Sequence, residues 1–277
     1  STIRVYDIRK GTVAGVFEGH TKRVTYLAFH PDEDILYSSS WDGTIRCWNT
    51  TTGRCVKILK STNNGFINHF ILTKDGEYLY SEGSGRIHKW NTKTGILIAH
   101  SGDDELILDY DYLVLSDDEY TFYAFSHTNP NISVWEATSL QRHVVPSYHE
   151  NGIISVVKSP DGNFLYTAGW GGMVCLWDIS RTLTCRSLGV FKNHEKPVHQ
   201  MILGEKTLYA LGSNQGILKY QLKTLPSDIV LSKKEGMRFL LHNNFKYEVV
   251  AAEDTGVINI YDVETKKRKK SLVGHQG

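Results

Sequence analysis

The sequence lacks the features that mark several large classes of protein. No apolar run approaches the roughly 20 residues of a membrane-spanning helix, and no stretch has the pattern of a signal peptide. No segment of useful length shows the 3.6-residue apolar period of an amphipathic helix. The net charge is only +1 over 277 residues, so the composition predicts no bulk electrostatic field for nucleic acid. An all-β chain with no membrane span is therefore expected.

Motifs of metal centres and catalytic sites are also missing. The 12 histidines show no HxxxH or His/Cys pairing, and the acidic segment 103–105 lacks EF-hand spacing. There is no GxSxG motif, and Gly171-Gly172 is expected in a turn between strands, not before a helix. We therefore expect no metal, no cofactor and no enzymatic activity. Without CxxC spacing, reduced thiols of a cytoplasmic or nuclear protein are expected at Cys47, Cys55, Cys175 and Cys185.

What the sequence does contain is a repeat. An aromatic residue followed by an acid or amide returns seven times, with successive aromatics 42, 42, 45, 42, 43 and 41 residues apart. A period in the low forties is the length of one four-stranded propeller blade. The pairs are Tyr6-Asp7, Trp48-Asn49, Trp90-Asn91, Trp135-Glu136, Trp177-Asp178, Tyr220-Gln221 and Tyr261-Asp262.

The second repeat predicts four short strands, each bounded by turn residues. The expected strands are residues 24–29, 35–38, 44–48 and 55–59, and the turns carry His30-Pro31-Asp32, Trp41-Asp42-Gly43 and Thr51-Thr52-Gly53.

Counting strands by this pattern gives two strands and six full repeats. Residues 1–20 supply only a third and a fourth strand, and six complete repeats follow from about residue 22 to 273. We therefore predict a single domain over 1–277 in which residues 1–20 form half a blade. The full blades are expected to begin near Lys22, Asn64, Glu105, Asn151, Lys196 and Met237.

The second repeat resembles the WD-repeat β-propeller family, and the resemblance extends over essentially the whole chain. It implies an all-β, seven-bladed propeller of four-stranded antiparallel blades, with one blade incomplete. It also implies a buried tetrad in a blade: the His of Gly-His, a Ser or Thr of the second strand, an Asp of the next turn, and the Trp. Here these are His20, Ser38, Asp42 and Trp48, polar groups that would each be costly to bury alone.

The other repeats depart from the tetrad. The third, fourth and seventh lack the His, and the sixth keeps only His194, with Ala210, Asn214 and Tyr220 at the other places. The fifth keeps three members and has Gly171 where the Asp would be; the retained residues are His149, Thr167 and Trp177.

Two tryptophans outside the aromatic series, Trp41 and Trp170, directly precede the Asp position of the tetrad. Local packing on neighbouring loops would explain them, but the family resemblance also puts this turn on the face that commonly binds partners, where Trp is favoured at hot spots. We expect this face to bind a protein or peptide that carries an acidic or phosphorylated residue beside an apolar anchor. The expected contact residues are Arg23, Trp41, Phe66, Trp170, Lys196, Arg238 and Asp254.

Two further motifs have a structural and a functional interpretation. The basic run 266–270 suits protection of an exposed sheet edge; an import signal or a contact with anionic lipid or nucleic acid is the alternative.

Tyr6-Asp7-Ile8-Arg9 resembles the Trp-Asp-x-Arg box by which some WD-repeat proteins dock onto a cullin–RING ubiquitin ligase adaptor, with Tyr in place of Trp. An ordinary strand end explains it equally.

These observations favour a non-catalytic interaction scaffold, a subunit of a larger complex in the cytoplasm or nucleus. One alternative is a substrate receptor of a cullin–RING ubiquitin ligase. The other is an RNA-binding propeller that uses Trp41, Trp170 and Phe66 for stacking. Fold alone does not choose among them, because function lies in the sites that a fold carries.

Overall fold

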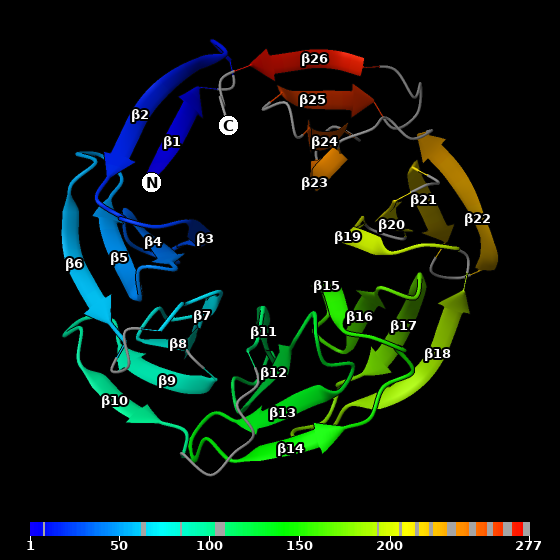
Figure 1. The fold of residues 1–277 in the computed structure, drawn as a ribbon, viewed down its shortest axis with the longest axis horizontal. Coiled ribbons are helices and arrows are strands. Elements are labelled where there is room, and N and C mark those ends of the chain that lie inside the picture. Colours follow the sequence, from blue (N-terminus) through cyan, green and yellow to red (C-terminus); the bar gives the residue numbers. More distant parts are fainter. Residues whose placement is uncertain are drawn as a thin grey trace. The chain divides into compact units, whose positions relative to one another are not determined.

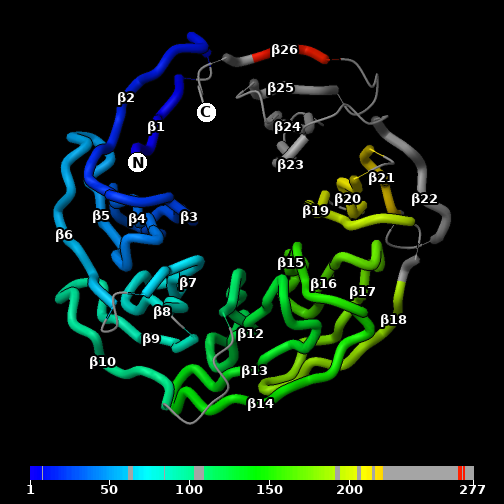
Figure 2. Tube along the Cα trace, in the orientation of Figure 1, coloured from blue at the N-terminus to red at the C-terminus, as the bar shows by residue number. Residues whose placement is uncertain are grey.

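The computed structural model describes residues 1–7, 9–61, 65–83, 85–102, 109–192, 194–204, 207–213, 216–221, 224–231, 237–243, 248–253, 257–262 and 268–273. Beyond residue 220 the description covers the course of the strands and the side chains of Arg268, Lys269 and Ser271. Figure 2 shows the course of the Cα trace, with colours from blue at the N-terminus to red at the C-terminus. Contacts divide the chain into two compact units, residues 1–126 with 132–145 and residues 127–131 with 146–277. The single domain and the count of seven blades stay predictions.

Every regular element in the described residues is a β-strand, and Figure 1 labels them in chain order. No helix with the length and apolar character needed to cross a bilayer occurs among these residues. The all-β prediction is therefore confirmed.

The first unit contains one two-stranded and three four-stranded sheets, all antiparallel. Consecutive strands pair, because short turns join them. The strands are β1 (Thr2–Asp7), β2 (Thr12–Glu18), β3 (Val24–Phe29), β4 (Ile35–Ser40), β5 (Thr44–Asn49), β6 (Cys55–Lys60), β7 (Phe70–Leu72), β8 (Tyr78–Gly83), β9 (Arg86–Asn91), β10 (Leu97–His100), β11 (Tyr112–Leu115), β12 (Thr121–Phe125), β13 (Ile132–Glu136) and β14 (Arg142–Val145).

The second unit contains three further four-stranded sheets with the same strand order. Its strands are β15 (Ile153–Lys158), β16 (Phe164–Gly169), β17 (Met173–Asp178), β18 (Arg186–Lys192), β19 (Val198–Leu203), β20 (Thr207–Gly212), β21 (Gly216–Gln221), β22 (Thr224–Leu231), β23 (Met237–Asn243), β24 (Glu248–Glu253), β25 (Val257–Asp262) and β26 (Arg268–Val273).

The position of a strand within its sheet decides its burial. The second strands β4, β8 and β16 are buried along nearly their whole length, whereas the fourth strand β6 alternates between exposed residues and residues that are half-buried or, at Leu59, buried. Apolar clusters fill the spaces between neighbouring sheets; one joins Tyr37 and Cys47 to Phe70 and Trp90. A strand covered on both faces needs apolar or hydrogen-bonded side chains throughout.

The first strand of the third repeat is short and follows a loop that is bonded to the preceding sheet. This strand, β7, begins at Phe70. Before it, the Ile67 N–H donates to the Ser40 carbonyl at 3.3 Å, and the Ile67 carbonyl accepts from the Thr25 hydroxyl at 2.7 Å. Phe66 is therefore in a loop held against β3 and β4.

Candidate interaction surface

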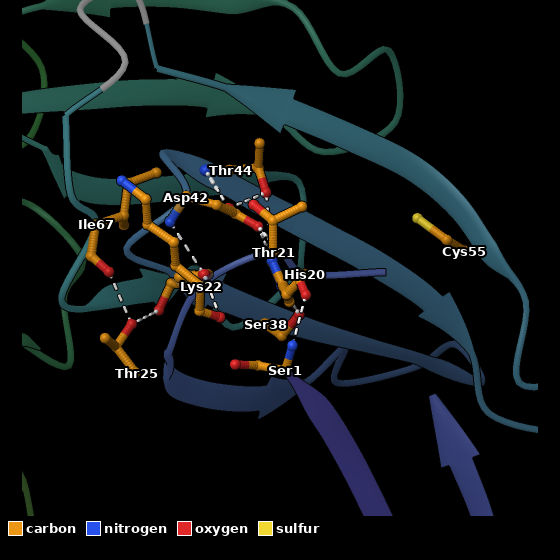
Figure 3. A network of polar contacts seen from close by, with 12 residues as sticks. Ser1, His20, Thr21, Lys22, Thr25, Ser38, Asp42, Thr44, Cys55 and Ile67 are labelled. Atoms are coloured by element: carbon orange, nitrogen blue, oxygen red, sulfur yellow. Dashed lines mark hydrogen bonds and ion pairs between the residues drawn. The ribbon is translucent and has the colours of Figure 1, made fainter. Parts of the chain in front are cut away.

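The four predicted tetrad residues of the second repeat lie in one hydrogen-bonded chain, shown in part in Figure 3. The Asp42 carboxylate is 2.8 Å from His20 Nδ1, and His20 Nε2 is 2.7 Å from Ser38 Oγ. The Trp48 indole N–H donates to the same Ser38 oxygen at 2.8 Å. The chain thus links the loop before β3 to β4, β5 and the β4–β5 turn.

The protonation of this chain follows from burial and hydrogen bonds. Burial lowers the pKa of His20, and the bond to Asp42 offsets this only in part. Burial alone would raise the pKa of Asp42, but hydrogen bonds from Thr44, His20 and Thr21 outweigh it and lower the pKa to about 2. At neutral pH a neutral imidazole therefore donates from Nδ1 to an ionised carboxylate and accepts at Nε2 from Ser38.

Asp42 also fixes the turn that carries Trp41. Its carboxylate accepts from the Thr21 N–H at 3.0 Å and from the Thr44 N–H and hydroxyl at 3.0 and 2.6 Å. Beside it, the Trp41 N–H donates to the Arg23 carbonyl at 3.0 Å. These bonds join the loop before β3 to the β4–β5 turn and hold residues 21–23 next to Trp41.

An exposed aromatic pair stands on this support. The Trp41 and Phe66 rings are 5.5 Å apart between centroids, and 37% of Trp41 and 53% of Phe66 remain exposed. The Arg23 guanidinium carbon is 5.3 Å from the Trp41 ring centroid, and the Lys22 ammonium is 5.2 Å from that of Phe66. We call Lys22, Arg23, Trp41 and Phe66 the Trp41 cluster.

The orientation of Trp41 is set by the next repeat. Its indole N–H donates to the Asn68 side-chain oxygen at 3.0 Å, and the Asn68 amide donates to the Tyr110 carbonyl at 3.4 Å. The expected local packing of Trp41 is thus present, and the outer face of the ring stays exposed. Lys22 and Asn68 were not predicted, although Lys22 adjoins Arg23 in the loop that was.

Trp170 is arranged differently in the second unit. Its indole N–H donates to the His127 carbonyl at 2.9 Å, and 43% of the residue is exposed. Lys196 is exposed in the loop before β19. The side chain of Arg238, on β23, and Asp254 lie outside the described residues. The structure therefore brings together Arg23, Trp41 and Phe66, and the meeting of all seven predicted contact residues stays a prediction.

The incomplete tetrads leave buried nitrogens without a partner. His149 Nε2 is 2.8 Å from Thr167 Oγ1, which also accepts from the Trp177 indole at 2.8 Å. His149 Nδ1 has no hydrogen-bond partner among the described residues, because Gly171 replaces the aspartate. In the third repeat, which lacks the His, the Trp90 indole donates to the Ser81 hydroxyl at 3.0 Å.

The described residues cover the two other predicted motifs, residues 6–9 and the basic run 266–270, only in part. The Asp7 side chain accepts from the backbone N–H groups of Arg9 and Lys10 at 2.9 and 3.0 Å, so it caps its own turn, and Ile8 lies outside the described residues. Of the basic run, Arg268 and Lys269 are exposed on the edge strand β26. Within the described residues, no three His, Cys, Asp or Glu side chains are grouped as a metal ion would require.

A family model matches two of the repeats described above. The WD40 family (WD domain, G-beta repeat) matches residues 11–49, which contain the complete tetrad, and 141–178, which contain the one with Gly171. The chain contains WD40 repeats. The resemblance to the WD-repeat family is thereby confirmed.

The chain is also similar to longer proteins. It is 30% identical over 188 residues to target of rapamycin complex subunit wat1 of Schizosaccharomyces pombe, covering 63% of this chain and 57% of that protein. It is 26% identical over 183 residues to nuclear distribution protein nudF of Emericella nidulans, covering 59% of this chain and 41% of that protein. The chain thus spans about half the length of these curated relatives.

A solved structure supports the fold. The crystal structure of the computationally designed Ika8 protein matches with a TM-score of 0.74 at 22% identity, covering 99% of this chain and 82% of that one. This likeness concerns the fold alone.

Removal of the Asp42 carboxylate tests the tetrad. Asp42→Ala leaves the His20 Nδ1–H and the Thr21 N–H without their acceptor, and losing a partner in a buried network costs about 1–3 kcal/mol of unfolding free energy. Urea unfolding at pH 7 measures this. Unchanged stability of Asp42→Ala would contradict the assignment.

Supplying the missing acceptor in the fifth repeat should raise the unfolding free energy. Gly171→Asn supplies a neutral acceptor for His149 Nδ1, and the nearest atom to a new Cβ there, Glu150 Oε2, is 3.8 Å away. We expect the unfolding free energy to rise by about 0.5–1.5 kcal/mol, the net value of one hydrogen bond. His149→Gln alone and combined with Gly171→Asn is the control, since the gain should need the imidazole.

Buried histidines should make the fold acid-sensitive. Burial lowers the pKa of His69 to about 3 and those of His88, His149 and His194 to about 4. The unfolded chain, with ordinary pKa values near 6.5, therefore binds protons first as the pH falls. Stability should be full above pH 6.5 and decrease by about 1–2 kcal/mol per buried imidazole between pH 7 and 5.

Urea unfolding at pH 7, 6 and 5 measures this slope. His194→Asn should reduce it, and replacement of the exposed His143 by Asn should not. Equal slopes in wild type and His194→Asn would show that this imidazole is not held neutral.

Proposed function

We propose that this WD-repeat chain is a non-catalytic scaffold that binds a protein or peptide through the Trp41 cluster. The observation that carries this is the exposed Trp41–Phe66 pair held by backbone and side-chain bonds. Its geometry is fixed before a partner arrives, which reduces the entropy lost on binding. Rigid exposed aromatics surrounded by polar groups are typical of binding hot spots.

The cluster suits a partner with an acidic or phosphorylated residue beside an apolar anchor. Lys22 and Arg23 extend over the two rings, and neither forms an ion pair with an acidic residue of the described part of the chain. Their donors can therefore meet a carboxylate or phosphate while the rings cover an apolar side chain. Trp170 and Lys196 offer a similar pair of side-chain types in the second unit.

The relatives fit a scaffold that works inside a complex. By its name, wat1 is a subunit of the target of rapamycin complex. By analogy we infer that this chain is a subunit of a larger assembly in the cytoplasm or nucleus. A receptor role in a cullin–RING ligase has less support, since Asp7 is engaged within its own turn.

The test is the binding of partners recovered with the tagged protein, with and without nuclease treatment, followed by measurement on the purified pair. Trp41→Ala should weaken binding by at least about 2 kcal/mol, which is roughly 30-fold, because it removes the centre of the cluster. Tyr120→Ala is the matched control: Tyr120 is 60% exposed in the turn before β12, at the other end of the strands.

Two results would contradict the proposal. One is normal binding by folded Trp41→Ala and Trp170→Ala proteins together with loss of binding in Lys267→Ala, which would assign the site to the basic edge. The other is nuclease-sensitive binding that falls steeply with salt, which would favour RNA.

A further inference from the structure

A second candidate site lies at the opposite end of the same strands. A cavity of about 510 Å³ is present in the first unit, lined by residues of β4, β5 and β6 and by turns of the third repeat. Ile35, which begins β4, lines the cavity, whereas Trp41 follows the last residue of β4. The cavity is therefore separate from the Trp41 cluster. We call it the His30 cavity.

The walls of the His30 cavity are held by specific bonds. The Lys57 ammonium donates to the carbonyls of Thr92 and Lys93 at 2.5 and 2.6 Å, which ties β6 to the β9–β10 turn. The Thr92 hydroxyl donates to the Gly76 carbonyl at 2.6 Å. These bonds fix the positions of the turns that line the cavity.

His30 forms another wall. Its Nδ1 accepts from the backbone N–H groups of Asp32 and Glu33 at 3.2 and 3.1 Å, and its ring stacks on Tyr37 at 6.4 Å. Gly76 has φ of +70°, and a Cβ there would come within 2.2 Å of His30 Nε2. The glycine lets the turn before β8 close against the imidazole.

The lining of the cavity combines apolar and acidic residues. Ile35 and Val56 are part of it, as are Glu33, Asp75 and Glu77. No ion pair joins these acids to a basic residue of the described part of the chain. Asp75 Oδ1 accepts from the Thr73 hydroxyl at 2.6 Å and from the Glu77 N–H at 2.9 Å, which orients this carboxylate. The lining also holds Lys93 and Lys57, whose ammonium donates to two carbonyls, so the acids outnumber the lysines by three to two.

We propose that the His30 cavity binds the arginine side chain of a partner peptide. The aliphatic stem of an arginine would pack on Val56 and Ile35, and its guanidinium would face Glu33 and Asp75. A planar guanidinium also stacks on rings such as the His30 imidazole, which an ammonium group does less well. The site does not depend on the function proposed for the Trp41 cluster.

The experiment is a ¹H–¹⁵N NMR titration of the labelled protein with acetyl-Gly-Arg-Gly-amide and with the peptide in which citrulline, a neutral isostere, replaces arginine. We expect the arginine peptide to shift amides of residues 30–35, 56–57, 75–77 and 92–93, and the citrulline peptide to bind about 5-fold more weakly or less. Glu33→Gln should weaken the arginine peptide by about 2- to 5-fold, and Glu18→Gln, on exposed β2, should not.

The proposal is overturned if both peptides bind equally, if the shifts map elsewhere, or if no shift occurs at about 10 mM peptide, where even a weak side-chain site would fill. It is also overturned if acetyl-Gly-Glu-Gly-amide binds the cavity more tightly than the arginine peptide. Glu33 is exposed, so Glu33→Gln should remain folded; its amide spectrum shows this directly.

Discussion

The Asp42 carboxylate is the group on which the proposed binding surface depends. It receives hydrogen bonds from the imidazole of His20, from the backbone of Thr21 and from Thr44. These donors come from the loop before β3 and from the turn and strand that follow β4. Each of these hydrogen bonds alone contributes modestly to stability, but together, in a partly buried site, they hold two loops in one geometry. Trp41 directly precedes Asp42 in sequence, and the bonds of Trp41 to the Arg23 carbonyl and to Asn68 complete its support.

The same physics explains why the repeats differ. Where an aspartate is absent, as at Gly171, the imidazole of His149 keeps one bond and loses the other. Burial then lowers its pKa, because nothing favours the charged form. Packing of Trp177 and the antiparallel strands maintains such a sheet without the full network. In the described residues the second repeat therefore has the complete tetrad, whereas the fifth keeps only the links among His149, Thr167 and Trp177.

The fold was accessible from the sequence because its signals are local and periodic. Aromatic spacing identified the repeat, and turn residues placed most strands of the second repeat within about two residues, the usual uncertainty of boundaries. The bonds of Ile67 to another sheet, just before β7, were not accessible. The Trp41 cluster was predicted in part, through Arg23, Trp41 and Phe66. Asn68 and the His30 cavity require knowledge of which turns meet in space.

The most direct test of this account is the tautomer of His20, read from ¹⁵N imidazole chemical shifts of the labelled protein at pH 7. The account predicts a neutral ring with the proton on Nδ1, facing Asp42, and an Nε2 that accepts from Ser38. An Nε2–H tautomer would contradict it, since His20 would then donate to Ser38 and not to Asp42. Asp42 would in that case not hold the loop before β3 through His20.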